Sequence, residues 1–205
     1  MKTITDIKPQ VKNKSRVSVY LDGSYYCGLD LATTLKYRLK VGQQIEENTL
    51  VEIQKNSELQ ACFDSALNLI SSTIKTEREV VARLIKKGYL EEVAIETVEK
   101  LKSYGYIDDF DYATRYVETY KNTQGKRAIA LKLKQKGVPQ EDVEKVVSAM
   151  ENQSEQAYVL AQKYMKNKAV DKKNLQKLYK YLLSKGFDYD ECKFATSKFD
   201  ENIED

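Results

Sequence analysis

Apolar residues recur every three or four positions along most of the chain after residue 57, which is the pattern of amphipathic α-helices. Three lysine-glycine pairs interrupt it, at Lys87-Gly88, Lys136-Gly137 and Lys185-Gly186. Their interval is constant, because 137 − 88 and 186 − 137 both equal 49. The positions four and eight residues before each glycine are also apolar: Leu84, Leu133 and Leu182, and Val80, Ile129 and Leu178. Both offsets fall on one helical face, so the pattern predicts a repeated helical unit with Gly88, Gly137 and Gly186 as helix C-caps.

The first 57 residues follow a different pattern, in which apolar and polar residues alternate as in β-strands. Val17, Val19 and Leu21 alternate with polar neighbours, Asp22-Gly23 suits a hairpin turn, and residues 25–29 form the returning strand. Residues 4–7 are a candidate third strand, and a short helix is predicted over residues 30–39. The sequence thus predicts a small β-containing N-terminal domain, residues 1–57.

Three helices are predicted in each following unit: 58–72, 76–87 and 91–104; 108–121, 125–136 and 139–150; 153–168, 171–185 and 188–199. Capping residues mark several starts: Thr76 with Glu79 matches a capping box, and Asp171 and Asp188 suit N-caps. The predicted fold is mainly α, with three tandem three-helix repeats at 58–107, 108–151 and 152–205 in an elongated curved array, because units this small are marginal alone. Unrelated helices that each end in glycine are the alternative.

Composition excludes several classes of protein. The chain is 41% apolar and 32% charged, and no window approaches the roughly 18 apolar residues of a membrane span. No signal peptide is recognisable at the N-terminus, so we expect a cytoplasmic protein with no membrane partner. Histidine is absent, and Cys27, Cys62 and Cys192 are too far apart to form a close metal-binding pair. Because phosphate-binding glycine loops are also missing, we expect no catalytic residue, no cofactor and no metal.

Acidic residues gather where one predicted helix begins, at Asp108, Asp109 and Asp111. Carboxylates at this place cap the exposed amides of the first turn and stabilise the positive end of the helix dipole. Metal binding is the alternative function of such a cluster. We favour capping, because no second acidic group stands at a matching spacing.

Basic residues concentrate on the second helix of each predicted unit, although the net charge is only +3. Residues 119–140 contain six basic residues and no acid, and residues 163–185 contain eight lysines against one aspartate. Cations at regular spacing suit a polyanion or an acidic groove. The candidate binding residues are Arg78, Arg83, Lys86, Lys87, Lys121, Lys126, Arg127, Lys132, Lys134, Lys136, Lys173, Lys177, Lys180 and Lys185. Solvated faces, with lysine favoured at helix C-termini by the dipole, are the alternative.

Tyrosine is abundant, with 15 residues against 5 phenylalanines. Some of these rings could stack on exposed nucleic-acid bases. We expect most of them to line contacts between helices, with the ring buried and the hydroxyl in water.

A longer motif resembles a known family. Gly105-Tyr106-Ile107-Asp108-Asp109 is followed by Tyr112-Ala113, Tyr116, Gly125, Ile129, Leu133 and Lys136-Gly137-Val138, and this combination is similar to the RecX family of bacterial regulatory proteins. The resemblance covers about residues 58–199. Glu118 departs from it, since a basic residue often stands there in the family, and the third unit matches less well after Phe187.

The resemblance implies a regulatory role, in which the protein binds the filament of the RecA recombinase on single-stranded DNA and modulates, most often inhibits, ATP hydrolysis and strand exchange. The partners expected are then RecA and single-stranded DNA, reached directly or through RecA, and the protein is expected to be a monomer and no enzyme. Two alternatives remain: a nucleic-acid-binding repeat protein that needs no recombinase, and a helical scaffold for an unrelated acidic protein.

Overall fold

A four-stranded antiparallel sheet forms the N-terminal head of the protein. The computed structural model describes residues 1–11 and 14–200, and the strands are β1 (Lys2–Pro9), β2 (Arg16–Leu21), β3 (Ser24–Asp30) and β4 (Gln44–Ile45), in the order β3-β2-β1-β4. Val17, Val19 and Leu21 are buried, and Asp22 and Gly23 turn the hairpin with positive φ angles of 48° and 86°. The hairpin and the third strand predicted from the alternation are therefore confirmed, and β4 is a short addition.

The short helix α1 (Leu31–Lys36) follows β3 and is capped by Asp30, whose carboxylate accepts the Ala32 amide (2.9 Å). This helix is shorter than the predicted 30–39, because the chain turns at Arg38 with a φ of 52°. It buries Thr33 and Thr34 and leaves Leu35 69% exposed.

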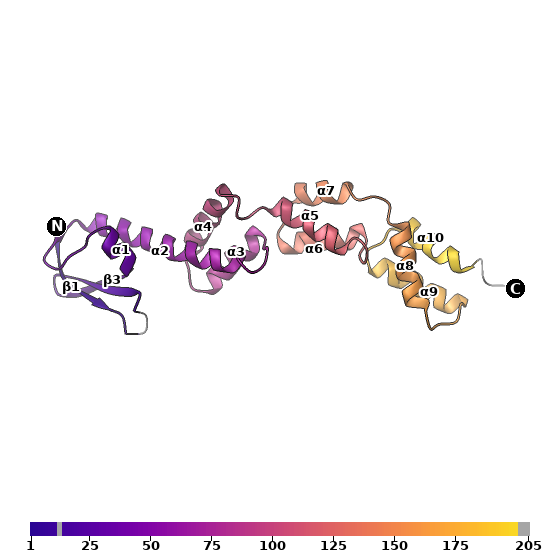
Figure 1. Ribbon diagram of the computed structural model, residues 1–205, viewed down its shortest axis with the longest axis horizontal. Helices are drawn as coiled ribbons and strands as arrows, with labels where there is room; N and C mark the ends of the chain where they lie inside the picture. The colour runs from indigo at the N-terminus through magenta and orange to yellow at the C-terminus, as the bar shows by residue number, and fades with distance from the viewer. Residues whose placement is uncertain (12–13, 201–205) are drawn as a thin grey trace. The chain divides into compact units, whose positions relative to one another are not determined.

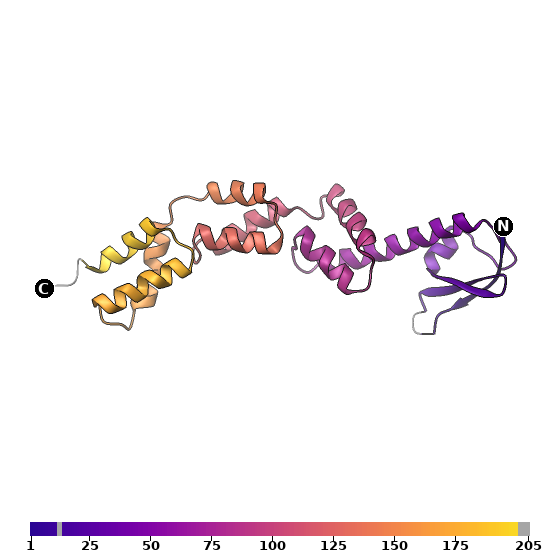
Figure 2. The same cartoon turned by 180° about the vertical axis from the view of Figure 1, so that it is seen from behind.

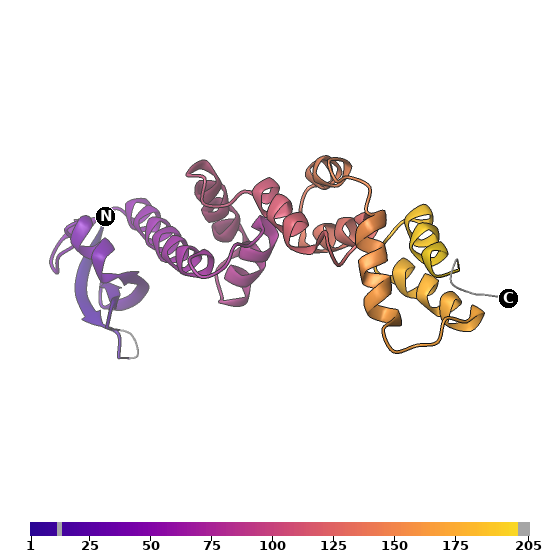
Figure 3. The ribbon, with the colours of Figure 1, turned by 45° about the vertical axis from the view of Figure 1, so that its right-hand side comes forward.

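The long helix α2 (Glu47–Ile70) connects the sheet with the first helical repeat (Figure 3). The sequence pattern leads from residues 41–45 into a longer helix, but the first repeat was expected to begin with its own helix at residue 58, and the head was expected to end near Ser57. The structure instead buries Leu50 and Ile53 in the core of the sheet and Cys62 and Ala66 further along the same helix. No glycine or proline interrupts residues 47–70, so one helix spans the expected boundary.

The remaining helices form three-helix groups, as predicted. They are α3 (Glu77–Lys86) and α4 (Glu91–Ser103), which follow α2, then α5 (Asp109–Tyr120), α6 (Lys126–Lys136) and α7 (Gln140–Ser148), and α8 (Ser154–Met165), α9 (Lys172–Ser184) and α10 (Tyr189–Asp200) (Figures 1 and 2). Val80, Leu84, Ile129, Leu133, Leu178 and Leu182 are all 0% exposed. The apolar columns of the 49-residue repeat are therefore the cores of the helical groups.

The same glycine turn ends the second helix of each repeat. The amide after the glycine donates to the leucine carbonyl five residues earlier, in the pairs Tyr89 to Leu84 (3.2 Å), Val138 to Leu133 (3.1 Å) and Phe187 to Leu182 (3.3 Å). The three glycines have φ angles of 99°, 91° and 87°, which cost glycine little and strain any other residue. The repeat seen in the sequence is thus a repeat of local geometry.

Contact clustering divides the described chain into two compact units. The first contains Met1–Thr73 and Val80–Tyr106, and the second contains Ile74–Glu79 with the described residues from Ile107 onward. The first turn of α3 therefore belongs with the second and third repeats. Contacts between successive repeats can be followed inside the second unit.

Those contacts join the starts of α3 and α6 to the lysine-glycine ends of α6 and α9. The Gly125 amide donates to the Lys185 carbonyl (2.9 Å), and at the equivalent place the Thr76 hydroxyl donates to the Lys136 carbonyl (2.7 Å). The places are equivalent because 125 − 76 and 185 − 136 both equal 49. In both places the C-terminal end of the second helix of one repeat therefore contacts the N-terminal start of the second helix of the preceding repeat.

At the contact between α6 and α9 two backbones touch. The Arg127 amide donates to the Gly186 carbonyl (3.2 Å), and a Cβ built on Gly125 would lie closer than 3.0 Å to that carbonyl. A Cβ on Gly186 would in turn lie closer than 3.0 Å to the backbone of Ala128. Glycine at both positions is therefore required by close approach.

Buried side chains complete both contacts. Asp109 accepts the Glu77 amide (2.9 Å), and Gln153 accepts the equivalent Lys126 amide (3.0 Å) through its side-chain oxygen. The backbone amide of Gln153 donates to Glu191 (2.9 Å). All three acceptor residues are 5% exposed or less, so loss of any one would leave a buried donor without a partner.

Candidate interaction surface

The basic residues of the second helices recur in columns that follow the repeat. Arg78 and Arg127 are 49 residues apart, as are Arg83 and Lys132, and Lys87, Lys136 and Lys185 form a third column. The first two columns are exposed, but the members of the third column differ in their surroundings. The structure therefore separates surface cations from cations used inside the fold.

Helix α6 carries its cations around an exposed face. Arg127, Lys132 and Lys134 are exposed, while Ile129 and Leu133 face the core. The Lys132 ammonium donates to Gln135 (3.3 Å), and the Arg127 guanidinium lies over the Tyr189 ring, 5.8 Å from its centroid. None of the three has an acid within ion-pair distance in the described chain, so their charge is directed to solvent.

Lys136 belongs to the contact between repeats. Its ammonium lies 2.8 Å from the Glu79 carboxylate and 5.5 Å from the Tyr112 ring centroid, and its side chain is 33% exposed. The hydrogen bond that Lys136 donates to Glu79 raises the pKa of Lys136 above its ordinary value. Burial opposes ionisation of Glu79, but the hydrogen bonds from Lys136 and the Thr76 amide hold the pKa of Glu79 below its ordinary value. Lys136 is therefore a cation of the contact between repeats and does not belong to the exposed cationic face of α6.

A Glu79→Gln variant tests this assignment. The amide oxygen can still accept the Thr76 amide, so the variant removes mainly the charge that faces Lys136. We expect a loss of about 1 kcal/mol or less at neutral pH, because the pair is partly exposed. Since the pKa of Glu79 is lowered in the folded state, the difference from wild type should disappear as the pH falls below 4.5. Urea unfolding at pH 7 and pH 3 measures both values, and equal differences at the two pH values would contradict the assignment.

Helix α9 carries a ridge of lysines. Lys173, Lys177 and Lys180 stand at i, i + 4 and i + 7, are exposed, and have no acidic partner within ion-pair distance in the described residues. Beside them Lys185 lies over the Tyr181 ring (5.4 Å), and Tyr181 stacks on Tyr164 at 4.5 Å between centroids. The ridge is therefore flanked by half-buried aromatic rings.

The other candidates are divided between the two units. Arg78 lies at the contact between repeats, near Gly137, whereas Arg83 and Lys86 are exposed in the first unit. Lys87 donates to the Ser65 hydroxyl (2.9 Å), and Lys121 pairs with Glu118 at 2.7 Å. The departure at Glu118 thus places a carboxylate beside a candidate cation. Lys126 is half-buried.

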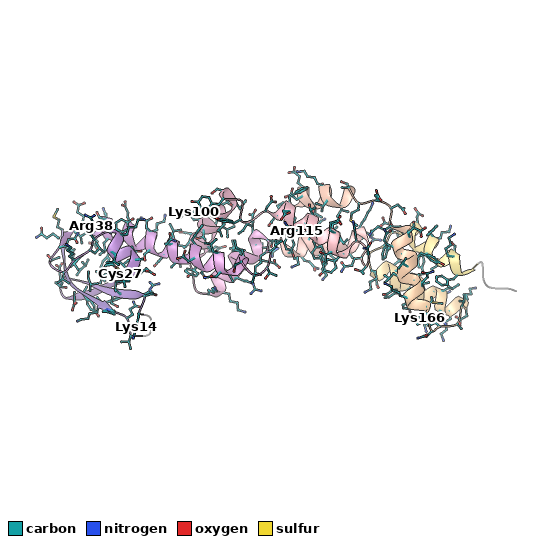
Figure 4. All side chains as sticks on the ribbon, in the orientation of Figure 1. Lys14, Cys27, Arg38, Lys100, Arg115 and Lys166 are labelled. Atoms are coloured by element: carbon teal, nitrogen blue, oxygen red, sulfur yellow. The ribbon has the colours of Figure 1, made fainter. Side chains whose placement is uncertain are left out.

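Arg115 on α5 and Lys166 at the end of α8 are among the cationic residues of the second unit that sequence reasoning did not select (Figure 4). Arg115 pairs with Asp111 (2.8 Å) one turn earlier. Lys166 is exposed and extends the lysine-rich region that precedes α9. Only the charge count of residues 163–185 pointed to Lys166, because the helical repeat does not include it.

Within the acidic cluster at residues 108–111, Asp108 caps α5. It accepts the amides of Phe110 (2.8 Å) and Asp111 (3.0 Å), which confirms the capping interpretation for this residue. Asp109 instead accepts the Glu77 amide of α3, and Asp111 pairs with Arg115. Among the described residues no group of three or more His, Cys, Asp or Glu side chains could hold a metal ion.

Tyrosines mostly pack between helices. Tyr112, Tyr116 and Tyr120 line α5 one turn apart, with centroid distances of 6.3 and 4.4 Å, and all three are half-buried against the core. Tyr106 and Tyr189 are exposed, at 58% and 62%. A base can stack only on exposed rings of this kind, because the half-buried rings are covered by neighbouring side chains.

The three cysteines are buried, with Cys27 on β3 inside the head (Figure 4). Burial raises the pKa of Cys27 and of Cys192 to about 11, and it also raises the pKa of Cys62. The thiols are therefore protonated at neutral pH and are poor nucleophiles.

The fold and these surfaces define a protein of helical repeats that presents cationic faces. In the described residues, no helix is both long and apolar enough to cross a bilayer. Four sequence profiles match the chain: the regulatory protein RecX N-terminal domain at residues 2–46, and the first, second and third three-helix domains of RecX at residues 62–101, 108–147 and 151–196.

Individual relatives agree with the profiles. The chain is 35% identical to the regulatory protein RecX of Clostridium botulinum (strain Alaska E43 / Type E3), over 93% of this chain and 92% of the relative, and 34% identical to that of Clostridium perfringens (strain 13 / Type A), over 98% of each. A crystal structure of regulatory protein RecX aligns with 96% of this chain at a TM-score of 0.71 and 27% identity. The RecX crystal structure from Lactobacillus salivarius aligns with 70% at 0.64 and 29%. The chain belongs to the RecX family of regulatory proteins.

Proposed function

We propose that this protein binds the RecA filament on single-stranded DNA and inhibits its ATP hydrolysis and strand exchange, and thereby regulates recombination, DNA repair and the SOS response. Membership of the RecX family supports the proposal. The observation that carries it is the exposure of cations on the equivalent helices α3, α6 and α9. We also propose that the protein acts as a cytoplasmic monomer, since bacterial DNA lies in the cytoplasm.

Repeats suit a filament as a partner. A recombinase filament presents the same surface on each protomer in turn, and its DNA presents phosphates at regular intervals. A chain that repeats one cationic helix can make equivalent contacts with successive sites. No catalytic group is needed for such an effect, because a bound protein can alter the filament by stabilising one of its states.

Titration of this protein into a RecA reaction is the direct test. We expect ATP hydrolysis on single-stranded DNA to fall as the protein is added, and the filaments seen by electron microscopy to shorten. Because cationic contacts are screened by salt, inhibition should weaken as the salt concentration rises. The matched comparison is a variant in which Arg127, Lys132 and Lys134, the exposed cations of α6, are changed to glutamine. An unchanged hydrolysis rate together with unchanged filament length would reject the proposal.

The lysine ridge of α9 favours a second candidate function, binding to nucleic acid without a recombinase. This function needs only phosphate contacts, which three neighbouring unpaired lysines can supply. Binding of the isolated chain to single-stranded DNA in the absence of RecA distinguishes the two functions. Salt-sensitive binding would support the second function, and its absence together with RecA inhibition would leave the first.

A further inference from the structure

Two of the three lysine-glycine helix ends are occupied by the start of another helix. At Gly186 the occupant is the first turn of α6, and at Gly137 it is the first turn of α3. In both places a Cβ on the glycine would lie closer than 3.0 Å to the occupant, and the carbonyl of the preceding lysine accepts a hydrogen bond from it. The lysine-glycine end of a helix therefore binds the N-terminal start of another helix at two places in the chain.

The third helix end, at Lys87-Gly88, has the same geometry and no occupant within the described chain. Gly88 has a φ of 99°, and a Cβ built on it would meet no atom within 4 Å. The carbonyls of Lys87 and Gly88 accept no hydrogen bond from the described residues. Ile85 and Leu90 beside them are 41% and 66% exposed, so apolar surface flanks two open acceptors.

We propose that the Lys87-Gly88 end of α3 is a docking site for the first turn of an α-helix that a partner protein supplies. The acceptors are carbonyls at the negative end of a helix dipole, which suit the free amides and positive end of a helix start. The residues that fill the equivalent places, Thr76 and Gly125, show which N-cap fits: a glycine or a small hydroxyl residue. Ile85 and Leu90 would receive an apolar side chain of the same partner helix.

A second copy of the chain does not supply this helix start. The starts of α3 and α6 are already held by the following repeat, but no repeat follows α9 in the described chain. The position of α9 equivalent to Gly125 is Asn174, since 174 − 125 equals 49. Helix α9 begins earlier, at Lys172, and Asp171 accepts the Asn174 amide (2.7 Å) while the Asn174 side chain donates to the Ala169 carbonyl (3.0 Å). The start of α9 is therefore capped by its own residues, and a different protein is the occupant that we propose.

A helical peptide of known fit can probe the site. Residues 124–136, stapled on the face opposite Ile129, reproduce the helix start that occupies Gly186. Added to the isotope-labelled full chain, this peptide should shift the amide resonances of residues 85–90. The same peptide with Gly125→Val should bind at least tenfold more weakly, because a branched side chain would separate the two backbones.

Two variants of the protein test the site itself. Gly88→Ala places a methyl group where the occupant would lie and should abolish the shifts, whereas Gly105→Ala introduces the same strain at a glycine with a φ of 71° and open surroundings, and should keep them. If Gly88→Ala folds poorly, the double variant Ile85→Ser with Leu90→Ser tests the site in its place. It changes only exposed side chains and should weaken binding several-fold.

Three outcomes would overturn the proposal. One is the absence of shifts at residues 85–90 at millimolar peptide, and another is an equal response of wild type and Gly88→Ala. The third is self-association of the protein without peptide that Gly88→Ala removes, which would identify a second copy as the occupant.

Discussion

Gly186→Ala is expected to destabilise the second unit by about 3 kcal/mol, and Gly88→Ala should cost only about 1 kcal/mol. Both glycines end the second helix of a repeat with positive φ, at 87° and 99°. A left-handed conformation costs an ordinary residue about 1–2 kcal/mol. At Gly186 the added Cβ would also lie closer than 3.0 Å to the Ala128 backbone, and overpacking of this kind adds about 1–3 kcal/mol. At Gly88 nothing lies within 4 Å.

Two further glycines complete the series. Gly125→Ala adds a Cβ in a position with a negative φ of −77°, so it measures the close approach without the backbone strain. Gly137→Ala adds the strain together with a close contact to the Arg78 side chain. The far end of this side chain can move but its Cβ is held by the backbone, so the loss should fall between those of Gly88→Ala and Gly186→Ala. Gly137→Val should be worse, since branching adds to the strain.

Urea unfolding followed by circular dichroism gives the stability of each variant, and hydrogen exchange in α6 and α9 locates the change. Hydrogen exchange is needed because two units need not unfold together. Equal losses for Gly186→Ala and Gly88→Ala would mean that the close contact between α6 and α9 does not exist in solution.

Neutralising the ridge of α9 is expected to weaken single-stranded DNA binding about 100-fold at 0.1 M salt. Each phosphate contact contributes about 0.7 to the slope of log K against log salt for a single strand. Replacement of Lys173, Lys177 and Lys180 by glutamine would remove three contacts, so the slope should fall by about 2. Stability should change by less than about 1 kcal/mol, because exposed unpaired lysines contribute little to folding.

A control with the same change in charge separates contact from net charge. Lys8, Lys55 and Lys145 pair with Asp6, Glu96 and Glu141 at 2.6, 3.7 and 2.6 Å, so their replacement by glutamine removes three charges that are already compensated. Affinity should then change only slightly. Fluorescence anisotropy with a labelled oligonucleotide at several salt concentrations measures both variants. Equal losses in the two triple variants would assign binding to the overall charge and remove the ridge from the site.

Sequence reasoning was most successful where local interactions decide the structure. Helix ends at Gly88, Gly137 and Gly186, the capping box at Thr76 and the cap at Asp108 depend on residues within five positions of one another. Such hydrogen bonds are encoded by nearby residue types, so their pattern can be read along the chain. The expected boundary near Ser57 lies inside α2, because burial of Leu50 and Ile53 against a distant sheet extends the helix.

The surface was harder to predict than the fold. Charge and spacing made both Lys134 and Lys136 candidate binding residues. Lys134 is exposed, but Lys136 donates a hydrogen bond to Glu79, 57 residues away. The contact depends on how two repeats pack, which no local pattern reports. The same is true of Gln153 and Asp109, whose buried side chains accept hydrogen bonds from amides 27 and 32 residues away.

The sequence by itself determined the repeat, the helices, the head with its hairpin and the family, because apolar periodicity and glycine turns act over a few residues. Only the tertiary structure decided which lysines remain exposed and why Gly125 and Gly186 have no side chain. It alone showed that the Gly88 end is open while the equivalent ends are filled. The physical reason is that exposure and close approach are set by contacts between segments far apart in the chain.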